Sequence, residues 1–174
     1  FETLAPSKNA TSRTRIQMTE KGSPETLAAN TGGEVSVGQN SSVQFQGNSF
    51  VDEQGNNYSG TVYVYSFYID PTDVDIDQIM PGNLMSRNTN NELRVLESYG
   101  MMNVVIEGDA GQKLDINKSA TLTTEVPNSI LSTAPNEIPL WYFDEDKGIW
   151  KEEGSATLQN GKYIGTVEHF TFWN

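Results

Sequence analysis

Short stretches of alternating apolar and polar residues run through this chain from about residue 32 onward, and such alternation is typical of β-strands. The strongest stretch is Thr61–Ile69, which consists almost wholly of β-branched and aromatic residues. Its nearly continuous apolar character predicts a strand that is covered on both faces. The other predicted strands lie at residues 35–37, 43–45, 93–98, 102–107, 120–126, 139–143, 149–151, 162–167 and 169–173.

Turn-forming residues separate these stretches. The dipeptide Asn160-Gly161 lies between two short apolar stretches, and in that setting it predicts a tight β-hairpin. The sequence Asp-Glu-Asp-Lys-Gly at residues 144–148 predicts a second hairpin, between the strands on either side of it. Closely spaced hairpins of this kind join antiparallel neighbours.

Helical periodicity is nearly missing, and the only candidates are single turns at residues 73–80 and 128–131. We therefore predict an all-β fold, an antiparallel β-sandwich of roughly ten short strands with very little helix. Residues 1–25 hold few large apolar groups and several turn formers, which predicts a linker or N-terminal arm. The sandwich domain is then expected over residues 26–174.

Composition narrows the classes of partner and of chemistry. The 174 residues suit one domain, and 23 acidic against 11 basic side chains give a net charge of -12. This charge argues against nucleic acid and against electrostatic attachment to an anionic membrane. No apolar run approaches the ~20 residues that span a bilayer. Cysteine is absent and His169 is the single histidine, so thiolate chemistry, disulfides and sites with two histidines are excluded.

Several strings of residues match a known family in order along the chain. The most specific are Pro139-Leu-Trp-Tyr-Phe-Asp144 and His169-Phe-Thr-Phe-Trp-Asn174. Over residues 26–174 the chain resembles the extracellular β domain of Bacteroidetes surface proteins and lipoproteins. The same pattern is found in animal cartilage intermediate layer protein and related membrane-protein ectodomains.

This resemblance implies an exported, surface-exposed and non-enzymatic module, anchored to the outer membrane in the full-length protein and joined to other domains of the same chain. It brings no settled ligand. A chain that begins at Phe1 without an initiator Met is expected to be a mature product or a piece of something longer.

The tripeptide His169-Phe170-Thr171 resembles the cleavage motif of self-cleaving β domains, such as the autoproteolysis domain of adhesion receptors. In that chemistry the Thr171 hydroxyl would attack the Phe170 carbonyl in an N-to-O acyl shift, with His169 as the base, and water would cleave the resulting ester. The alternative is an ordinary last strand through residues 168–173, with His169 hydrogen-bonded at its edge.

An acidic run is the candidate metal site. Alternating carboxylates can supply the oxygen ligands that Ca²⁺ prefers, although the run lacks the glycine and the final glutamate of an EF-hand loop. The alternative is a solvated loop whose carboxylates cap turns. The candidate ligands are Asp70, Asp73, Asp75 and Asp77.

Aromatic residues offer a second kind of binding surface, because exposed rings beside carboxylates suit a carbohydrate ligand. Most of them must build the core of a domain this size, and Tyr99 and Trp150 are the pair we expect to be exposed. The adjacent Glu152 and Glu153 cannot act as a glycosidase pair, since neighbours on a strand point to opposite faces.

The sequence as a whole therefore favours a structural or adhesive recognition module of an extracellular or cell-surface protein. Its partner would be an extracellular glycan or protein, and it would need no cofactor, except for Ca²⁺ if the acidic run binds it. Self-cleavage and carbohydrate binding are the alternatives. The oligomeric state and the ligand are left open.

Overall fold

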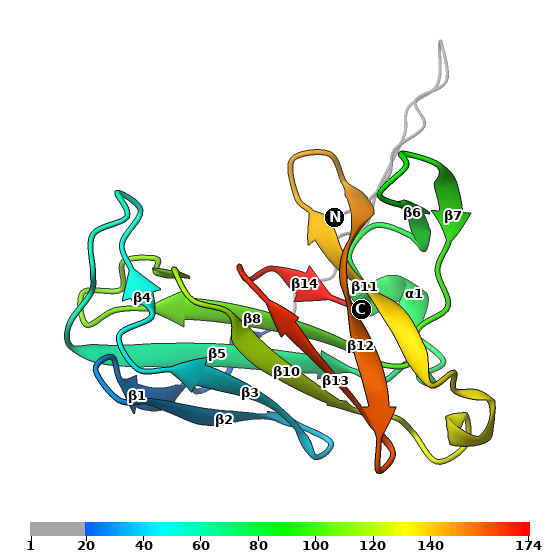
Figure 1. Cartoon of the computed structure of the whole chain (residues 1–174), viewed down its shortest axis with the longest axis horizontal. Coiled ribbons are helices and arrows are strands. Elements are labelled where there is room, and N and C mark those ends of the chain that lie inside the picture. The colour runs from blue at the N-terminus through cyan, green and yellow to red at the C-terminus, as the bar shows by residue number, and fades with distance from the viewer. Residues whose placement is uncertain (1–19) are drawn as a thin grey trace.

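The computed structural model describes residues 20–174, and fourteen strands dominate this part of the chain (Figure 1). The all-β class is confirmed. The predicted arm at residues 1–25 lies largely outside the described residues. The strands are β1 (Glu25–Ala28), β2 (Gly32–Gly38), β3 (Ser41–Gln46), β4 (Phe50–Val51), β5 (Thr61–Ile69), β6 (Met85–Arg87), β7 (Leu93–Val95), β8 (Met101–Glu107), β9 (Asp115–Ile116), β10 (Ala120–Glu125), β11 (Glu137–Asp144), β12 (Ile149–Gln159), β13 (Lys162–Val167) and β14 (Phe172–Trp173).

Twelve of these strands form one sheet, in the order β11-β14-β8-β5-β1-β2-β3-β10-β13-β12-β6-β7. An additional pairing of β11 with β12 closes all of them except β6 and β7 into a ring. Strands β4 and β9 form a separate two-stranded sheet. The prediction of purely antiparallel pairing is wrong at one place, where β6 runs parallel to β12. The reason is that β6 is not joined to β12 by a hairpin, which would make the two strands antiparallel; the two strands lie far apart in the chain.

The interior of the ring holds the main core, and residues from its opposite sides pack together there. Val35 of β2 and Phe45 of β3 belong to the same buried cluster as Val104 and Ile106 of β8. Two packed layers of strands are the arrangement expected of a sandwich. A second cluster of buried residues, centred on Trp150, lies where the short helix α1 (Ile76–Ile79) packs against the sheet.

The local predictions hold where the signal is strongest. Strand β5 matches the predicted range, with Val62, Val64 and Ile69 buried and its other residues half-buried. Asn160 and Gly161 both have positive φ, 52° and 82°, which is the geometry of a two-residue hairpin turn between β12 and β13. The hairpin at residues 144–148 also forms, and Gly148 N donates to Asp144 O at 2.8 Å.

Several predicted elements differ in extent, and the largest difference is in β12, which runs over Ile149–Gln159 where residues 149–151 were predicted. The strand at 93–98 is shorter, because β7 ends at Val95, and the helical turn expected at 128–131 is a 3₁₀ turn, η1 (Leu131–Thr133). The predicted last strand is broken: β13 ends at Val167, the chain bends, and only Phe172–Trp173 form β14. In residues 20–174 there is no helix of the length and apolarity that crossing a bilayer requires.

Candidate functional site

A groove of about 430 Å³ is bounded by two backbone segments, residues 94–100 and residues 135–141. The first segment continues from β7 and the second includes the first half of β11, so we call it the β7–β11 groove. Side chains of β10, β12 and β13 complete it. Figure 1 shows β7 and β11 at the same end of the molecule, far from β4.

The floor of the β7–β11 groove is apolar and closely packed. Leu122, Leu140 and Ala156 are all buried there. Gly165 belongs to the same floor, and an added Cβ would come within 2.8 Å of both Leu140 Cδ1 and Ser155 O. A larger residue at this position would therefore push into the strand that forms the groove wall.

Two tyrosines fix the walls of the groove. Tyr163 is buried and its hydroxyl donates to Pro135 O at 2.7 Å, which ties the floor to the second wall. Tyr99 meets Tyr163 edge-on, with ring centroids 5.6 Å apart. Burial raises the pKa of Tyr163 to about 12, and burial next to the Glu97 carboxylate also raises the pKa of Tyr99. Both hydroxyls therefore stay protonated at neutral pH and can donate hydrogen bonds.

Asn174 supplies a buried acceptor in the lining of the groove. Its backbone forms two hydrogen bonds with Trp141 of β11, of 2.8 and 2.9 Å. The residue is only 8% exposed, and its Oδ1 has no hydrogen-bond partner among the described residues. A buried acceptor without a donor costs about 1–3 kcal/mol, so this oxygen favours a ligand that brings an N–H or O–H group.

The charged groups of the groove are mostly acidic. Glu97, Glu137 and Glu152 are part of its lining, and the one basic side chain there is Arg94. The Arg94 guanidinium forms an ion pair with Glu92, which offsets its charge. The potential of the groove is therefore negative, which favours a cationic partner.

The sequence prediction for exposed aromatic residues is wrong. Trp150 is 0% exposed, because it packs edge-on against Phe143 and lies beside β6, the strand that pairs with β12 in parallel. Tyr99 is 8% exposed and is buried apart from the edge that meets the β7–β11 groove. The two residues belong to different core clusters and do not form a platform.

The predicted calcium ligands do not converge. Asp70 Oδ1 accepts hydrogen bonds from the backbone and the hydroxyl of Thr72, at 2.8 and 2.7 Å. Asp75 Oδ1 accepts one from Gln78 Nε2 at 2.7 Å. These are the turn-capping contacts of the alternative interpretation. Within residues 20–174 no three His, Asp, Glu or Cys side chains are grouped so that they could hold a metal, and this includes Asp70, Asp73, Asp75 and Asp77.

His169 and Thr171 lie at the bend between β13 and β14, where their polar atoms point to different partners. The Thr171 hydroxyl donates to Phe143 O at 3.0 Å, whereas His169 Nε2 lies 3.3 Å from Glu153 Oε1. Neither Phe170 nor Thr171 has a positive φ, and the described part of the chain has no cis peptide bond. Autoproteolysis at this bond stays an alternative, and it would require the Thr171 hydroxyl to leave the Phe143 carbonyl.

The neighbouring glutamates of β12 confirm the argument from strand geometry. Glu153 faces His169, whereas Glu152 Oε2 accepts a hydrogen bond from Thr89 N at 3.1 Å, on the side of the β7–β11 groove. The two carboxylates point to different faces and cannot flank one bond.

Comparisons with known proteins show a distant similarity to two cartilage intermediate layer proteins. The chain is 24% identical over 152 residues to cartilage intermediate layer protein 2 of Mus musculus, covering 84% of this chain and 13% of that protein. It is 25% identical over 122 residues to cartilage intermediate layer protein 1 of Sus scrofa, covering 68% of this chain and 20% of that protein. The chain thus spans a fifth or less of the curated relatives it matches. No family model and no solved structure matches it.

Sequence reasoning missed the residues that give the groove its chemistry, namely Glu97, Glu137 and Asn174. The run Leu-Arg-Val-Leu-Glu-Ser at 93–98 did predict a strand. Its position at the outer edge of the sheet depends on the parallel pairing of β6 with β12, for which the sequence holds no local signal.

Proposed function

We propose that this chain is a non-enzymatic recognition module of a larger extracellular protein, and that the β7–β11 groove is its binding surface. The supporting observation is the combination of an apolar floor with one buried polar atom that has no partner among the described residues, the Oδ1 of Asn174, and with the carboxylates of Glu97 and Glu137 in the lining. Concave apolar sites with a small number of converging polar groups are the usual form of ligand sites in proteins.

The extracellular setting is supported by the distant similarity to proteins named for the intermediate layer of cartilage. The finer proposal is a module on the surface of a Bacteroidetes-type cell, part of a lipoprotein or other surface protein anchored to the outer membrane. It is supported by the resemblance of residues 26–174 described above. Other domains of the same chain would hold the module away from the membrane.

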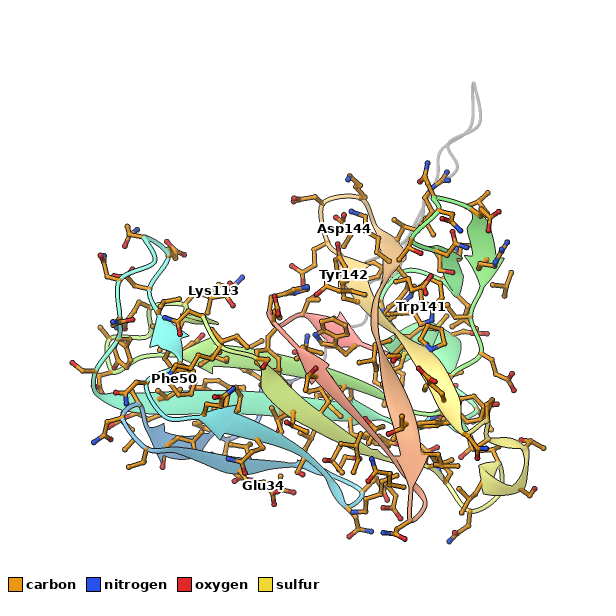
Figure 2. The ribbon with its side chains drawn as sticks, viewed as in Figure 1. Glu34, Phe50, Lys113, Trp141, Tyr142 and Asp144 are labelled. Atoms are coloured by element: carbon orange, nitrogen blue, oxygen red, sulfur yellow. The ribbon has the colours of Figure 1, made fainter. Side chains whose placement is uncertain are left out.

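The absence of cysteine makes a clean blocking experiment possible. Pro139 is exposed and lines the groove, so a Pro139→Cys variant coupled to a bulky maleimide would fill the groove without cutting into the core. Glu34 is exposed on β2, and Figure 2 shows it on another side of the fold from Trp141. Glu34→Cys with the same label is therefore the matched control.

Both labelled proteins and the unlabelled Pro139→Cys variant would be screened against a phage-displayed random peptide library and a glycan array. The proposal expects ligands that bind the unlabelled Pro139→Cys variant and the labelled control but not the labelled Pro139→Cys variant. Ligands that bind all three equally would place recognition elsewhere on the surface. If neither the peptide library nor the glycan array yields a ligand, that result would count against a recognition function.

A further inference from the structure

The groove is bordered by an open strand edge. Strand β7 is the last in the order of the large sheet, and β6 is its one neighbour among the described strands. In Figure 1 the β6–β7 hairpin projects at the edge of the fold, next to the β11 side of the molecule. An open edge offers unpaired backbone N–H and C=O groups to another extended chain.

The hydrogen-bond pattern shows which groups are unpaired. Leu96 N donates to Leu84 O at 2.8 Å, so Leu96 directs its backbone groups toward the β6 side. Antiparallel pairs alternate between bonded and non-bonded positions, so the backbone groups of Val95 and Leu93 point outward. The Arg94 guanidinium donates a hydrogen bond of 3.2 Å to the Leu93 carbonyl, which is therefore already satisfied. The backbone groups left to pair with another strand at the outer edge of β7 are the N–H of Leu93 and the N–H and C=O of Val95.

The side chains at this edge are unusually apolar. Val95 is 74% exposed, Leu93 53% and Met85, which pairs with Val95 across the hairpin, 38%. Edge strands that are protected from pairing carry charged residues or proline at such positions. Exposed apolar side chains on an open edge instead favour pairing with another extended chain, as happens when a peptide adds to a sheet as a strand.

We infer that the β7–β11 groove binds an extended basic peptide, which adds as a strand to the outer edge of β7. Backbone hydrogen bonds to Val95 and Leu93 would give affinity, and alternate side chains would give specificity. On one face, apolar side chains of the peptide would cover Leu93 and Val95. On the other, lysine or arginine side chains would lay their aliphatic stems over the apolar floor of the groove.

Charge complementarity selects this occupant. The ammonium or guanidinium heads would meet the Glu97 and Glu137 carboxylates, with Asn174 Oδ1 as a further acceptor. An acidic peptide would bring like charges together, and a second copy of this chain, which carries a net charge of -12, would do the same. The inference rests on the proposed function, since it names the partner of the same groove.

The test uses the intact chain and a synthetic probe peptide of alternating lysine and valine with blocked ends. A peptide of alternating glutamate and valine is the control. Amide hydrogen exchange followed by NMR should show that the lysine probe slows exchange at the N–H of Leu93 and Val95. Exchange at Arg94 and Leu96, which already face β6, should change little. The glutamate peptide should cause neither effect.

Two variants sharpen the test. Val95→Pro removes the outward N–H at a position where β6 does not need it, and should weaken probe binding about five-fold, the effect of one typical hydrogen bond. Val95→Ile keeps both that N–H and an apolar β-branched side chain, and should retain binding. N-methylation of alternate valines in the probe should cause the same loss without any change to the protein.

Different results would overturn different steps. Probe binding at the groove without protection of Leu93 and Val95 would refute strand addition and leave the proposed function standing. Protection of these two amides in the protein alone would mean that the edge is already occupied, within the chain or by a second copy. Equal binding of the glutamate peptide would refute the basic partner.

Discussion

Two buried tryptophans provide a paired test of the core. Trp150 is 0% exposed and Trp173 is 2% exposed, so the change to phenylalanine removes a similar volume from a closed site in each case. Their indole N–H groups differ. Trp173 Nε1 donates to His169 O at 3.2 Å, whereas Trp150 Nε1 has no hydrogen-bond partner among residues 20–174.

The expected difference follows from these two contacts. Trp173→Phe loses a hydrogen bond with a net value of about 1 kcal/mol in addition to the cost of its cavity. Trp150→Phe removes a buried donor that costs at least about 1 kcal/mol while it stays unpaired. If the cavity costs cancel, Trp173→Phe should destabilise the protein by about 2 kcal/mol more than Trp150→Phe.

Urea unfolding followed by far-ultraviolet circular dichroism would measure the free energy of unfolding for both variants and the parent. This signal reports on the sheet and does not depend on tryptophan fluorescence, which the substitutions themselves change. Equal losses, or a larger loss for Trp150→Phe, would refute the account of the two indole groups.

Further predictions concern the hairpin, the groove and the chain terminus. The hydrogen bond from the Lys151 ammonium to Asp144, at 2.5 Å, holds the pKa of Asp144 below its ordinary value. The resulting stability is therefore complete above the ordinary pKa of aspartate and is lost as the pH falls through the lowered value. Asp144→Asn should cost about 1 kcal/mol at neutral pH and little in strong acid, with Asp146→Asn as control, measured by the pH dependence of the urea midpoint. Gly165→Ala should lower stability by about 1–3 kcal/mol in thermal melts, because its Cβ would meet Leu140 and Ser155; a neutral result would contradict the packing of the groove floor. Since the Thr171 hydroxyl donates to Phe143, we expect the intact mass of the purified chain to be full length, and a mass short by residues 171–174 would show that self-cleavage occurs.

Sequence reasoning succeeded where the determinants are local. The composition of Thr61–Ile69 defines β5, and the positive φ of Asn160 and Gly161 is what an Asn-Gly turn requires. The short helix α1 also lies inside its predicted range. In each case the residues that decide the structure are neighbours in the chain.

The errors come from contacts between distant parts of the chain. Trp150 was expected to be exposed as part of a carbohydrate-binding surface, but β6, about sixty residues earlier in the chain, pairs beside it and helps to bury it. The strand predicted at residues 169–173 is reduced to two residues. Trp173 pairs with Tyr142 of β11, and the Trp173 indole N–H donates a hydrogen bond to His169 O, which lies in the bend before β14. The β7–β11 groove likewise depends on segments 94–100 and 135–141 meeting, which no local pattern predicts.

The most direct test of the binding surface is a map of backbone amide chemical shifts on the intact chain as a selected ligand is added. If the β7–β11 groove is the binding surface, the largest changes should occur in residues 94–100, in residues 135–141 and at Asn174. A second cleft, of about 390 Å³ beside Asp52 and Leu114, lies away from these segments and provides the comparison. Changes centred on that cleft, with the β7–β11 groove unaffected, would contradict the central claim.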